Sequence, residues 1–239
     1  MDIYGFERTT LLDFPGRIAC TVFVGGCNFR CPYCYNPELV LGFSNRPPRI
    51  ADEELFSFLR NRRAVLDGVV VCGGEPTLQD DLGLFLGKVR ELGLATKLDT
   101  NGSRPATLRN VLEEGLLDFV SLDVKAPLDS RYRYAAGVTS SVEAVRESIG
   151  ILIRSGIDFE LRTTVVPGLH TKESLVDLAR QLADICPSSS GVKWFLQQFQ
   201  PRGCLDSSFV KIRPYGPTVL EEILEAVRAH ISTAELRGV

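Results

Sequence analysis

The sequence predicts an α/β fold, in the form of a partial, open (βα)6 barrel with parallel strands. Short apolar segments alternate six times with segments whose apolar residues recur at helical spacing. Repeated β-then-α units imply a parallel sheet with right-handed crossovers. Because a closed barrel of this type needs eight units, six units predict a sheet that stays open.

The predicted strands are short, mostly apolar and rich in β-branched or aromatic residues. Such runs are typical of parallel strands that are covered on both faces. The six segments are residues 18–24, 69–72, 96–99, 119–123, 159–165 and 194–199.

The predicted helices follow the strands in order. Their ranges are 52–62, 82–92, 106–114, 142–154, 172–185 and 218–231. The first of them carries Leu55 and Leu59 one turn apart after an acidic first turn. Ser141 and Thr171 are expected N-caps, and Gly93 is an expected C-cap.

Length and composition favour one domain over residues 1–239, without repeats or a linker. Residues 45–49 are expected to form a loop, since prolines cannot continue a helix. The 44% of hydrophobic residues suffices for a sizeable core. A net charge of −3 gives no basic face for nucleic acid. We find no apolar run of about 18 residues, so no membrane span is expected.

Cysteine usage points to a reducing compartment. The seven cysteines are an odd number, which argues against a disulfide framework. The N-terminal residues lack the basic and apolar regions of a signal peptide. We therefore expect a cytoplasmic protein.

Three of the cysteines, Cys27, Cys31 and Cys34, lie on one predicted loop with the spacing C-x3-C-x2-C. Ferredoxin clusters use four cysteines, so three suggest a [4Fe–4S] cluster with one iron open to a small molecule. The alternatives are chance cysteines in a buried loop or a zinc site. Zinc normally takes four nitrogen or sulfur ligands, and the sequence offers no second pair at suitable spacing.

Polar or glycine-rich residues follow the other predicted strands, where parallel α/β folds collect their chemistry. After the second strand come Gly73, Gly74, Glu75 and Pro76. Two glycines allow close backbone approach to a ligand, and the proline removes a donor, so carbonyls and the carboxylate remain to accept from an ammonium group. Taken alone, this run is also compatible with an ordinary turn.

Charged residues mark three further strand ends. Asp99 follows the third strand, while Asp123 and Lys125 follow the fourth. A buried lysine needs an anionic partner, and either a carboxylate-bearing ligand or a structural aspartate meets that need. Arg162 lies in the fifth strand and faces either the ligand side or solvent.

Together these motifs resemble the radical S-adenosylmethionine (radical SAM) superfamily. The aromatic Tyr33 before the third cysteine fits that pattern. The resemblance implies that the three cysteines bind a [4Fe–4S] cluster and that residues 73–76 hold the amino group of S-adenosylmethionine, with Glu75 bracing the loop. It also implies that Lys125 meets the cofactor carboxylate, and that Asp99 and Asp123 help to bind a monovalent cation there.

Within the superfamily the chain looks most like activating enzymes of glycyl-radical proteins. The likeness covers nearly the whole chain. The segments that show it are residues 10–17, the run Tyr35-Asn36-Pro37, and residues 121–127 and 196–201. The last two segments are most similar to the anaerobic ribonucleoside-triphosphate reductase activating branch.

Two departures from related activases are visible. A histidine that approaches the cofactor in pyruvate formate-lyase activating enzymes is replaced here by Gln198 or Gln200, and the resemblance assigns Gln198 to cofactor binding together with Tyr33 and Arg162. No inserted cysteine-rich ferredoxin segment is present, so one cluster is expected.

The resemblance implies a mechanism and its partners. An electron from flavodoxin or ferredoxin reduces the cluster, and S-adenosylmethionine is cleaved to methionine and a 5′-deoxyadenosyl radical. The radical removes hydrogen from a glycine of a glycyl-radical enzyme, here an anaerobic ribonucleotide reductase. Asp13 and Arg162 are expected to contact the entering polypeptide.

Two other functions stay open. One is a radical SAM enzyme for a small molecule or nucleoside, similar to 7-carboxy-7-deazaguanine synthase. The other is a non-catalytic iron–sulfur carrier, for which Glu75 and Lys125 would have no purpose. The sequence does not identify the hydrogen-donor substrate, the electron donor or the oligomeric state.

The remaining cysteines and histidines carry weaker signals. Cys20 and Cys72 are expected core residues, and Cys186 precedes a proline at a helix end. Cys204 is a candidate thiol on the substrate side. His170 is expected only to begin a helix.

Overall fold

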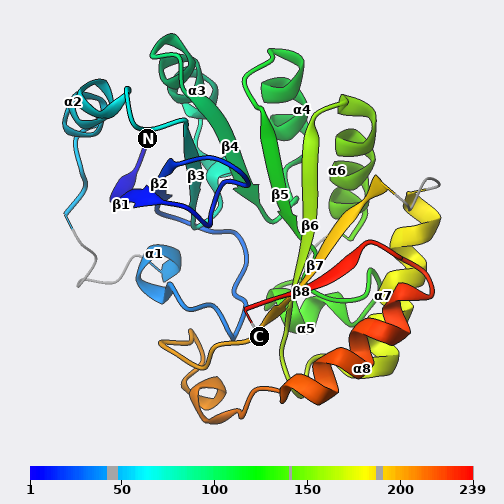
Figure 1. Cartoon of the computed structure of the whole chain (residues 1–239). Coiled ribbons are helices and arrows are strands. Elements are labelled where there is room, and N and C mark those ends of the chain that lie inside the picture. Colours follow the sequence, from blue (N-terminus) through cyan, green and yellow to red (C-terminus); the bar gives the residue numbers. More distant parts are fainter. Residues whose placement is uncertain (42–47, 140–141, 187–190, 239) are drawn as a thin grey trace. The chain divides into compact units, whose positions relative to one another are not determined.

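Strands and helices alternate along the chain in the computed structural model, which describes residues 1–41, 48–139, 142–186 and 191–238 (Figure 1). The strand order is β1-β2-β3-β4-β5-β6-β7-β8, with β1 and β8 at the edges. The expected α/β fold with an open sheet is therefore confirmed. The strands are β1 (Ile3–Thr10), β2 (Ala19–Val24), β3 (Gly68–Gly73), β4 (Ala95–Thr100), β5 (Phe119–Asp123), β6 (Asp158–Val165), β7 (Lys193–Gln198) and β8 (Ala234–Arg237).

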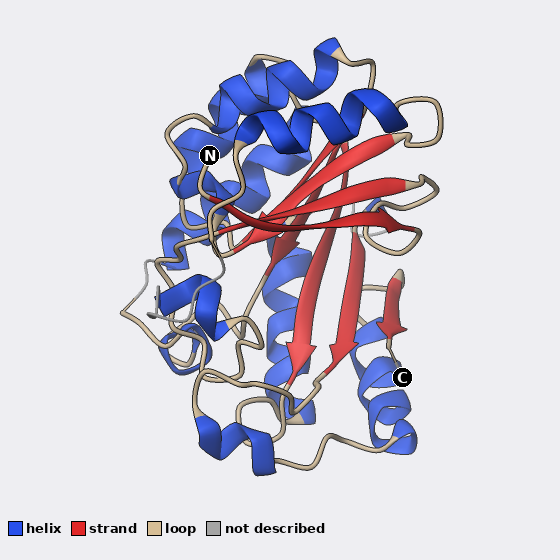
Figure 2. Cartoon of the chain, turned by 90° about the vertical axis from the view of Figure 1, so that its left-hand side faces the viewer, coloured by secondary structure: helices blue, strands red, loops and turns tan. Residues whose placement is uncertain are grey.

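The helices follow β2 to β7, as predicted (Figure 2). They are α1 (Pro37–Leu41), α2 (Asp52–Arg62), α3 (Leu82–Glu91), α4 (Pro105–Glu113), α5 (Tyr132–Ala136), α6 (Val142–Ser155), α7 (Lys172–Ile185) and α8 (Pro217–Arg228), with 3-10 helices η1 (Pro76–Leu78) and η3 (Ser207–Lys211). None of these helices is long and apolar enough to cross a bilayer, judged over the described ranges.

The helix caps agree with the sequence where they can be compared. Thr171 accepts a hydrogen bond from the Ser174 backbone in a capping box. Gly93, just after α3, has a positive φ of 78°. The expected cap Ser141 and most of the expected loop 45–49 lie outside the described residues. Helix α8 ends at Arg228, three residues before the predicted boundary, because the chain must turn into β8.

Four of these helices and strands were missed by the sequence prediction. Strand β1 pairs antiparallel with β2, and its exposed half lacks an apolar run. Strand β8 has four residues, and α1 and α5 have five each, which is too short for a periodic signal. The fold therefore adds one antiparallel and one parallel edge strand to the six predicted units.

The chain forms two compact units. Unit 1 contains residues 1–28, 38–100 and 106–121, and unit 2 contains residues 29–37, 101–105 and 122–239. The expectation of a single domain stays a prediction, and the units are described one by one.

Unit 1 is organised around β1 to β4. Strands β2 and β3 are parallel and in register, with Val24 opposite Gly73 at their carboxyl ends. A small core cluster includes Phe14, Val70 and Phe119, with the rings of Phe14 and Phe119 6.1 Å apart. The buried Phe14 anchors the connection that leads from β1 into β2, whereas Leu12 in the same connection is exposed.

Unit 2 is organised around β6 to β8, which are parallel. Leu175, Leu178 and Leu182 of α7 are buried at helical spacing, and α7 packs against α8. Trp194 of β7 is fully buried, and its indole N–H donates to Thr163 Oγ1 at 3.0 Å. The Thr163 hydroxyl in turn donates to the Val124 carbonyl at 2.8 Å, which ties the core to the end of β5.

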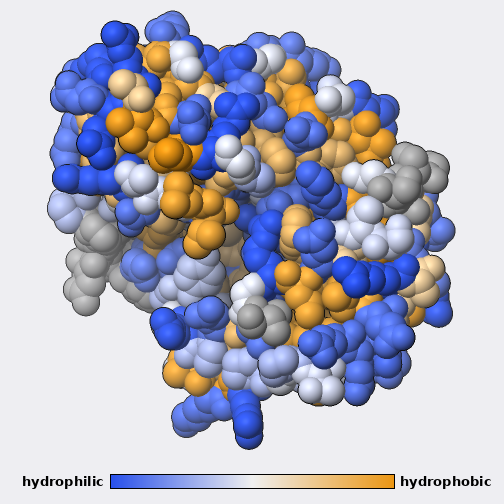
Figure 3. All heavy atoms as spheres, viewed as in Figure 1, coloured by the Kyte–Doolittle hydropathy of each residue, from blue (hydrophilic) through white to orange (hydrophobic). Residues whose placement is uncertain are grey.

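A buried ion pair fastens β8 within unit 2. Arg237 donates to both carboxylate oxygens of Glu160 at 2.9 Å. The guanidinium also lies 3.7 Å from the ring centre of Phe195 on the strand between them. The Glu160 side chain is 3% exposed, so it depends on this bidentate partner. Figure 3 shows hydrophobic residues interspersed with hydrophilic ones on the face in view.

The ion pair gives a stability prediction. Arg237→Ala should destabilise the protein by about 2–3 kcal/mol, because Glu160 loses two charge-assisted hydrogen bonds while Arg237 itself is partly screened by water. Urea unfolding followed by circular dichroism measures the change. Glu235→Ala, an exposed position on the same strand, is the control and should change stability little. Equal stabilities of the two variants would contradict the assignment.

Candidate active site

A first group of candidate residues lies in unit 1, where the segment before Cys27 meets the turn after β3. The Gly74 N–H donates to the Val24 carbonyl at 2.8 Å, and the Glu75 N–H donates to the Gly26 carbonyl at 2.7 Å. A Cβ atom on Gly74 would lie 1.9 Å from the Gly26 carbonyl oxygen. Glycine is therefore required at position 74 because two backbone segments of the protein touch there. The sequence had suggested close approach of the backbone to a ligand as the reason for the same glycine.

Glu75 braces this turn from inside. Its side chain is buried, with the residue 1% exposed. One carboxylate oxygen accepts hydrogen bonds from the Thr77 N–H at 3.1 Å, from the Thr77 hydroxyl, and from the Thr100 hydroxyl at 2.7 Å. The carboxylate thus links the end of β3 to the end of β4. This geometry matches the bracing role that the resemblance implies.

Two other predicted residues of unit 1 have local partners. Asp99 forms an ion pair with Lys97, which is almost fully buried. Asp13 accepts a hydrogen bond from the Thr21 hydroxyl at 2.7 Å, so its carboxylate holds the connection between β1 and β2.

A second group of candidate residues lies in unit 2, on the segment that carries Cys31 and Cys34. The Cys34 N–H donates to the Cys31 carbonyl at 3.0 Å and closes a turn. From one flank, the backbone of Leu205 donates to the Cys34 carbonyl at 2.8 Å, and that of Asp206 donates to the Pro32 carbonyl at 2.9 Å. Residues 205 and 206 therefore hold the Cys31–Cys34 turn in place through backbone hydrogen bonds.

Helix α5 holds the other flank of the same segment. The Arg30 N–H donates to the Ala136 carbonyl at 2.8 Å, and the rings of Phe29 and Tyr132 pack edge to face. Gly137 caps the helix with a φ of 67°. A Cβ atom on Gly137 would lie 1.8 Å from the Arg30 carbonyl oxygen, so only glycine fits.

Asp123 joins two predicted cations in unit 2. Its carboxylate accepts from Lys125 Nζ at 3.0 Å and from Arg162 Nε at 2.9 Å. Arg162 therefore faces the candidate site and not solvent. Burial disfavours the charged carboxylate, but Arg162 and Lys125 outweigh that effect and hold the pKa of Asp123 at about 2.

These shifts keep the cluster of charges ionised at neutral pH. Burial lowers the pKa of Lys125 and the Asp123 charge raises it, with a net result well above its ordinary value. For Asp123 the folded pKa lies below the unfolded value near 4, so its stabilising effect is present above about pH 4. That effect is lost only as the pH falls through about 2.

His170 is a site residue that sequence reasoning missed. The ring is fully buried, with Nδ1 accepting from the Val166 N–H at 2.9 Å. Its Nε2 therefore carries the proton and donates to the Lys125 carbonyl at 2.8 Å. Burial lowers the pKa of His170, so the ring stays neutral. Its position just after the fifth strand end was the only available signal.

The network continues to Gln198 at the end of β7. Gln198 Nε2 donates to the Tyr215 carbonyl at 2.8 Å, and the Tyr215 hydroxyl donates to the His170 carbonyl at 2.8 Å. The Tyr132 hydroxyl accepts from the Lys125 N–H at 3.3 Å. Lys125 is thus positioned through its backbone from two sides.

Two buried polar atoms in unit 2 support ligand binding. The Tyr33 hydroxyl and Gln198 Oε1 have no hydrogen-bond partner in the described part of the chain. Buried polar atoms of this kind are normally satisfied, and a bound ligand would supply the partners. Both residues are among those that the sequence assigned to cofactor binding.

The cysteines fit a cluster site in their chemistry. All seven lie in described segments, and none forms a disulfide. Cys27 belongs to unit 1, and Cys31 and Cys34 belong to unit 2. Within the described residues, no three His, Cys, Asp or Glu side chains form a ready metal site, so the ligand set depends on the motif and the family.

The remaining cysteines have structural surroundings. Cys20 is fully buried in β2, and burial raises the pKa of its thiol to about 12. Cys186 caps α7, as expected, and Cys72 is half-buried at the end of β3. Cys204 is buried on the segment that pairs with the Cys31–Cys34 turn, and burial raises its pKa.

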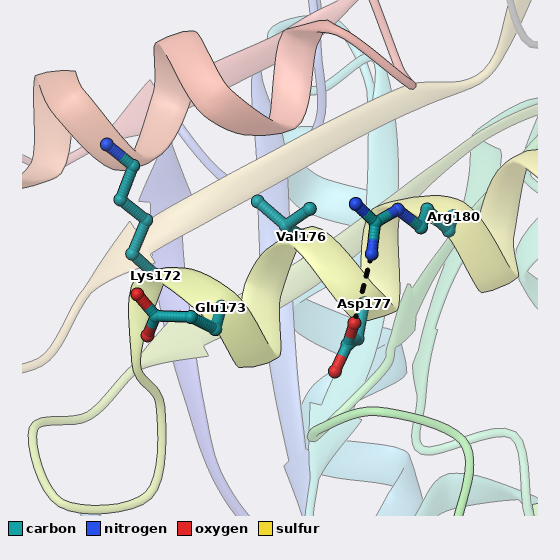
Figure 4. Close-up of a pocket in the computed structure, with 5 residues that line it drawn as sticks. All are labelled: Lys172, Glu173, Val176, Asp177 and Arg180. Carbon is teal, nitrogen blue, oxygen red and sulfur yellow. Dashed lines mark hydrogen bonds and ion pairs between the residues drawn. The ribbon is translucent and has the colours of Figure 1, made fainter.

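An exposed pocket on α7 is separate from these residues (Figure 4). Its lining residues are Lys172, Glu173, Val176, Asp177 and Arg180. The Asp177 and Arg180 side chains form an ion pair at 3.3 Å across one helical turn. Such surface pairs are ordinary on helices, and the pocket contains none of the predicted site residues.

Comparison with known proteins identifies the family. The sequence profile of the radical SAM superfamily matches residues 21–182. The chain belongs to this superfamily. Its members use a [4Fe–4S] cluster and S-adenosylmethionine, which confirms the expected cofactors and makes this chain a radical SAM enzyme.

The relatives include activating enzymes. The chain is 28% identical to a protein of Methanocaldococcus jannaschii named as a glycyl-radical enzyme activating enzyme, over 99% of this chain and 96% of that protein. It is 29% identical to the pyruvate formate-lyase-activating enzyme of Clostridium pasteurianum, over 77% and 76% of the two chains. A probable GTP 3′,8-cyclase of Thermococcus kodakarensis is 26% identical over 88% of this chain and 66% of that one.

A solved structure shows the same fold. Streptococcus suis SuiB, in a crystal structure bound to S-adenosylmethionine, matches with a TM-score of 0.66 and 16% identity. The match covers 91% of this chain and 52% of SuiB, so the chain spans about half the length of that protein.

The contact between Gly137 and Arg30 gives a prediction about the cysteine segment. Gly137→Ala should lower the iron retained after anaerobic reconstitution and change the electron paramagnetic resonance spectrum of the reduced cluster, because the new Cβ displaces the Arg30 carbonyl. Gly156→Ala is the matched control, since Gly156 has a similar φ of 74° but no atom within 4 Å of the added Cβ. Both variants carry a backbone cost of about 1 kcal/mol. Identical iron content and spectra in the two would contradict a positioning role for α5.

Proposed function

We propose that this chain is a glycyl-radical enzyme activating enzyme. The observation that carries the proposal is the similarity to the M. jannaschii relative over almost the full length of both chains. The substrate is then a glycine-bearing loop of a partner enzyme, and we propose an anaerobic ribonucleotide reductase, on the strength of the motifs at residues 121–127 and 196–201. The protein would act as one domain over residues 1–239 in an anaerobic cytoplasm.

In this proposal Cys27, Cys31 and Cys34 hold three irons of the cluster. When bound, the cluster and S-adenosylmethionine would supply the radical chemistry that removes a hydrogen atom from the glycine Cα. The close backbone contacts of Gly74 with Gly26 in unit 1 and of Gly137 with Arg30 in unit 2 fix the segments that carry the cysteines. The chain's own task is to position the cofactor and to exclude water from the reaction.

The other predicted residues bind the cofactor. The backbone of Gly73, Gly74 and Pro76 offers carbonyls to the amino group, while Glu75 holds that turn in shape. In unit 2, Lys125 meets the carboxylate with its charge preserved by Asp123. The further cofactor contacts are assigned to Tyr33, Arg162 and Gln198, and a monovalent cation to Asp99 and Asp123.

Cofactor binding is tested by Lys125→Ala. This variant should keep its iron but bind S-adenosylmethionine about ten- to a hundredfold more weakly, since it loses a charge-assisted contact worth roughly 1.5–3 kcal/mol. Calorimetry under anaerobic conditions measures the affinity. Cys31→Ala should lose the cluster itself, whereas Cys186→Ala should behave as the wild type. Wild-type affinity in Lys125→Ala would rule out the role assigned to this side chain.

The target is tested by mixing the reduced protein with S-adenosylmethionine and the ribonucleotide reductase of the same organism. A carbon-centred radical with a doublet electron paramagnetic resonance signal should appear on the reductase. Deuterium at the glycine Cα should collapse the doublet, because the splitting comes from the remaining α-hydrogen. Formation of 5′-deoxyadenosine without a radical on any glycyl-radical enzyme of that organism would overturn the activase function.

A second function is supported by the similarity to GTP 3′,8-cyclase. In that case the same residues bind the cluster and cofactor, and the hydrogen donor is a nucleotide or another small molecule. Deuterium transfer from labelled GTP into 5′-deoxyadenosine, without a partner protein, would favour this alternative.

A further inference from the structure

The surface around the Cys31–Cys34 turn carries exposed cationic and aromatic side chains. We define the basic loop face by Arg30, Tyr35, Arg133, Tyr134 and Arg202, all of them exposed residues of unit 2. Arg30 lies inside the cysteine motif, Tyr35 directly follows Cys34, and Arg133 and Tyr134 belong to α5. Arg202 precedes the segment that pairs with the turn.

Two backbone contacts bring these segments together. The Arg30 backbone is bonded to Ala136 at the end of α5, one turn beyond Arg133. On the other flank, a Cβ atom on Gly203, next to Arg202, would lie 3.7 Å from the Tyr35 carbonyl oxygen. The exposed side chains are therefore attached to backbone that directly contacts the cysteine turn.

The segments that carry this face have a charge opposite to that of the whole chain. Residues 29–36, 132–137 and 200–213 contain five cations, Arg30, Arg133, Arg202, Lys211 and Arg213, and one carboxylate, Asp206. The protein as a whole has a net charge of −3. Asp206 is engaged in capping η3, where it accepts from the Ser208 N–H at 2.8 Å. A positive patch on an acidic protein favours an acidic partner by electrostatic complementarity.

The two tyrosines of the basic loop face expose aromatic rings that a partner protein can contact. Tyr35 is 70% exposed and Tyr134 is 58% exposed. The Arg133 guanidinium lies 4.8 Å from the Tyr134 ring centre and also donates to its hydroxyl at 2.8 Å. Arginine and tyrosine are enriched among residues that dominate protein interfaces. Two such anchors amid cations suit a small, transient encounter more than a large permanent interface.

We propose that the basic loop face is the docking surface for the one-electron donor, a small acidic electron-transfer protein of the flavodoxin or ferredoxin class. The proposal rests on the radical SAM function, in which the cluster must accept one electron per cleavage while the donor is oxidised by one electron. The face lies beside the segment that carries Cys31 and Cys34, the two proposed cluster ligands of unit 2, so a carrier that docks there would come close to these thiols. Redox encounters of this kind use small interfaces and depend on charge for their rate.

The test compares a protein donor with a chemical one. The double variant Arg133→Glu, Arg202→Glu should be reduced by flavodoxin hydroquinone at least tenfold more slowly than the wild type at low ionic strength, because steering by complementary charge accelerates association by about 10–1,000-fold. Its reduction by dithionite, which needs no docking, should be unchanged. The difference between variant and wild type should shrink as the salt concentration rises.

A binding measurement and a matched control complete the experiment. Calorimetric affinity for flavodoxin should fall in the double variant even before the cluster is reconstituted. Arg154→Glu is the control: Arg154 is exposed in the last turn of α6, which leads to the amino end of β6, whereas the site residues lie near strand carboxyl ends. Equal flavodoxin rates in the double variant and wild type would overturn the proposal. Loss of dithionite-driven cleavage would show instead that the substitutions damage the site, and loss only of radical formation on the partner enzyme would assign the face to that partner.

Discussion

Backbone packing without room for a side chain is the constraint on which the candidate site depends. On one side of Asn28, the Gly26 carbonyl is met by the Gly74 backbone within unit 1. On the other side, the Arg30 carbonyl is met by Gly137 within unit 2. Each contact is accompanied by a hydrogen bond of 2.7–2.8 Å to the neighbouring backbone. The segments on the two sides of Asn28 are thus each held by main-chain atoms within their own unit.

Ion pairs and hydrogen bonds also fix the charged side chains of the candidate residues in unit 2. Asp123 serves two cations at once, and the backbone of Lys125 is held by Tyr132 and His170. Those holding contacts come from a tyrosine hydroxyl and a neutral histidine ring, while Asp123 supplies the negative charge that pairs with Lys125. Preorganised charges of this kind lose little rotamer freedom when a ligand arrives, which is how rigid sites gain affinity.

The sequence predicted the six β-α units because each has a long enough periodic segment, and Asp52–Arg62 and Lys172–Ile185 were predicted with the observed bounds. It could not predict β8, whose four residues are held by Arg237 bonding to Glu160, a contact between residues 77 positions apart. Helix α5 and the contacts of His170 were missed for the same reason, because each depends on backbone partners that are far away in the sequence. Glu75 and Lys125 were proposed as site residues because they follow predicted strands and because the family resemblance assigns them to the cofactor. The use of Gly74 became clear only when its neighbour Gly26 was seen.

The single tryptophan of the chain gives this protein an intrinsic optical probe. Trp194 is buried in unit 2, and one threonine hydroxyl connects its indole N–H to the carbonyl that precedes Lys125. Its emission maximum and lifetime therefore report on unit 2 alone. Any rearrangement of the backbone around Lys125 on ligand binding would reach the indole through Thr163, so quenching or a spectral shift offers a label-free signal for titrating cofactor into that unit.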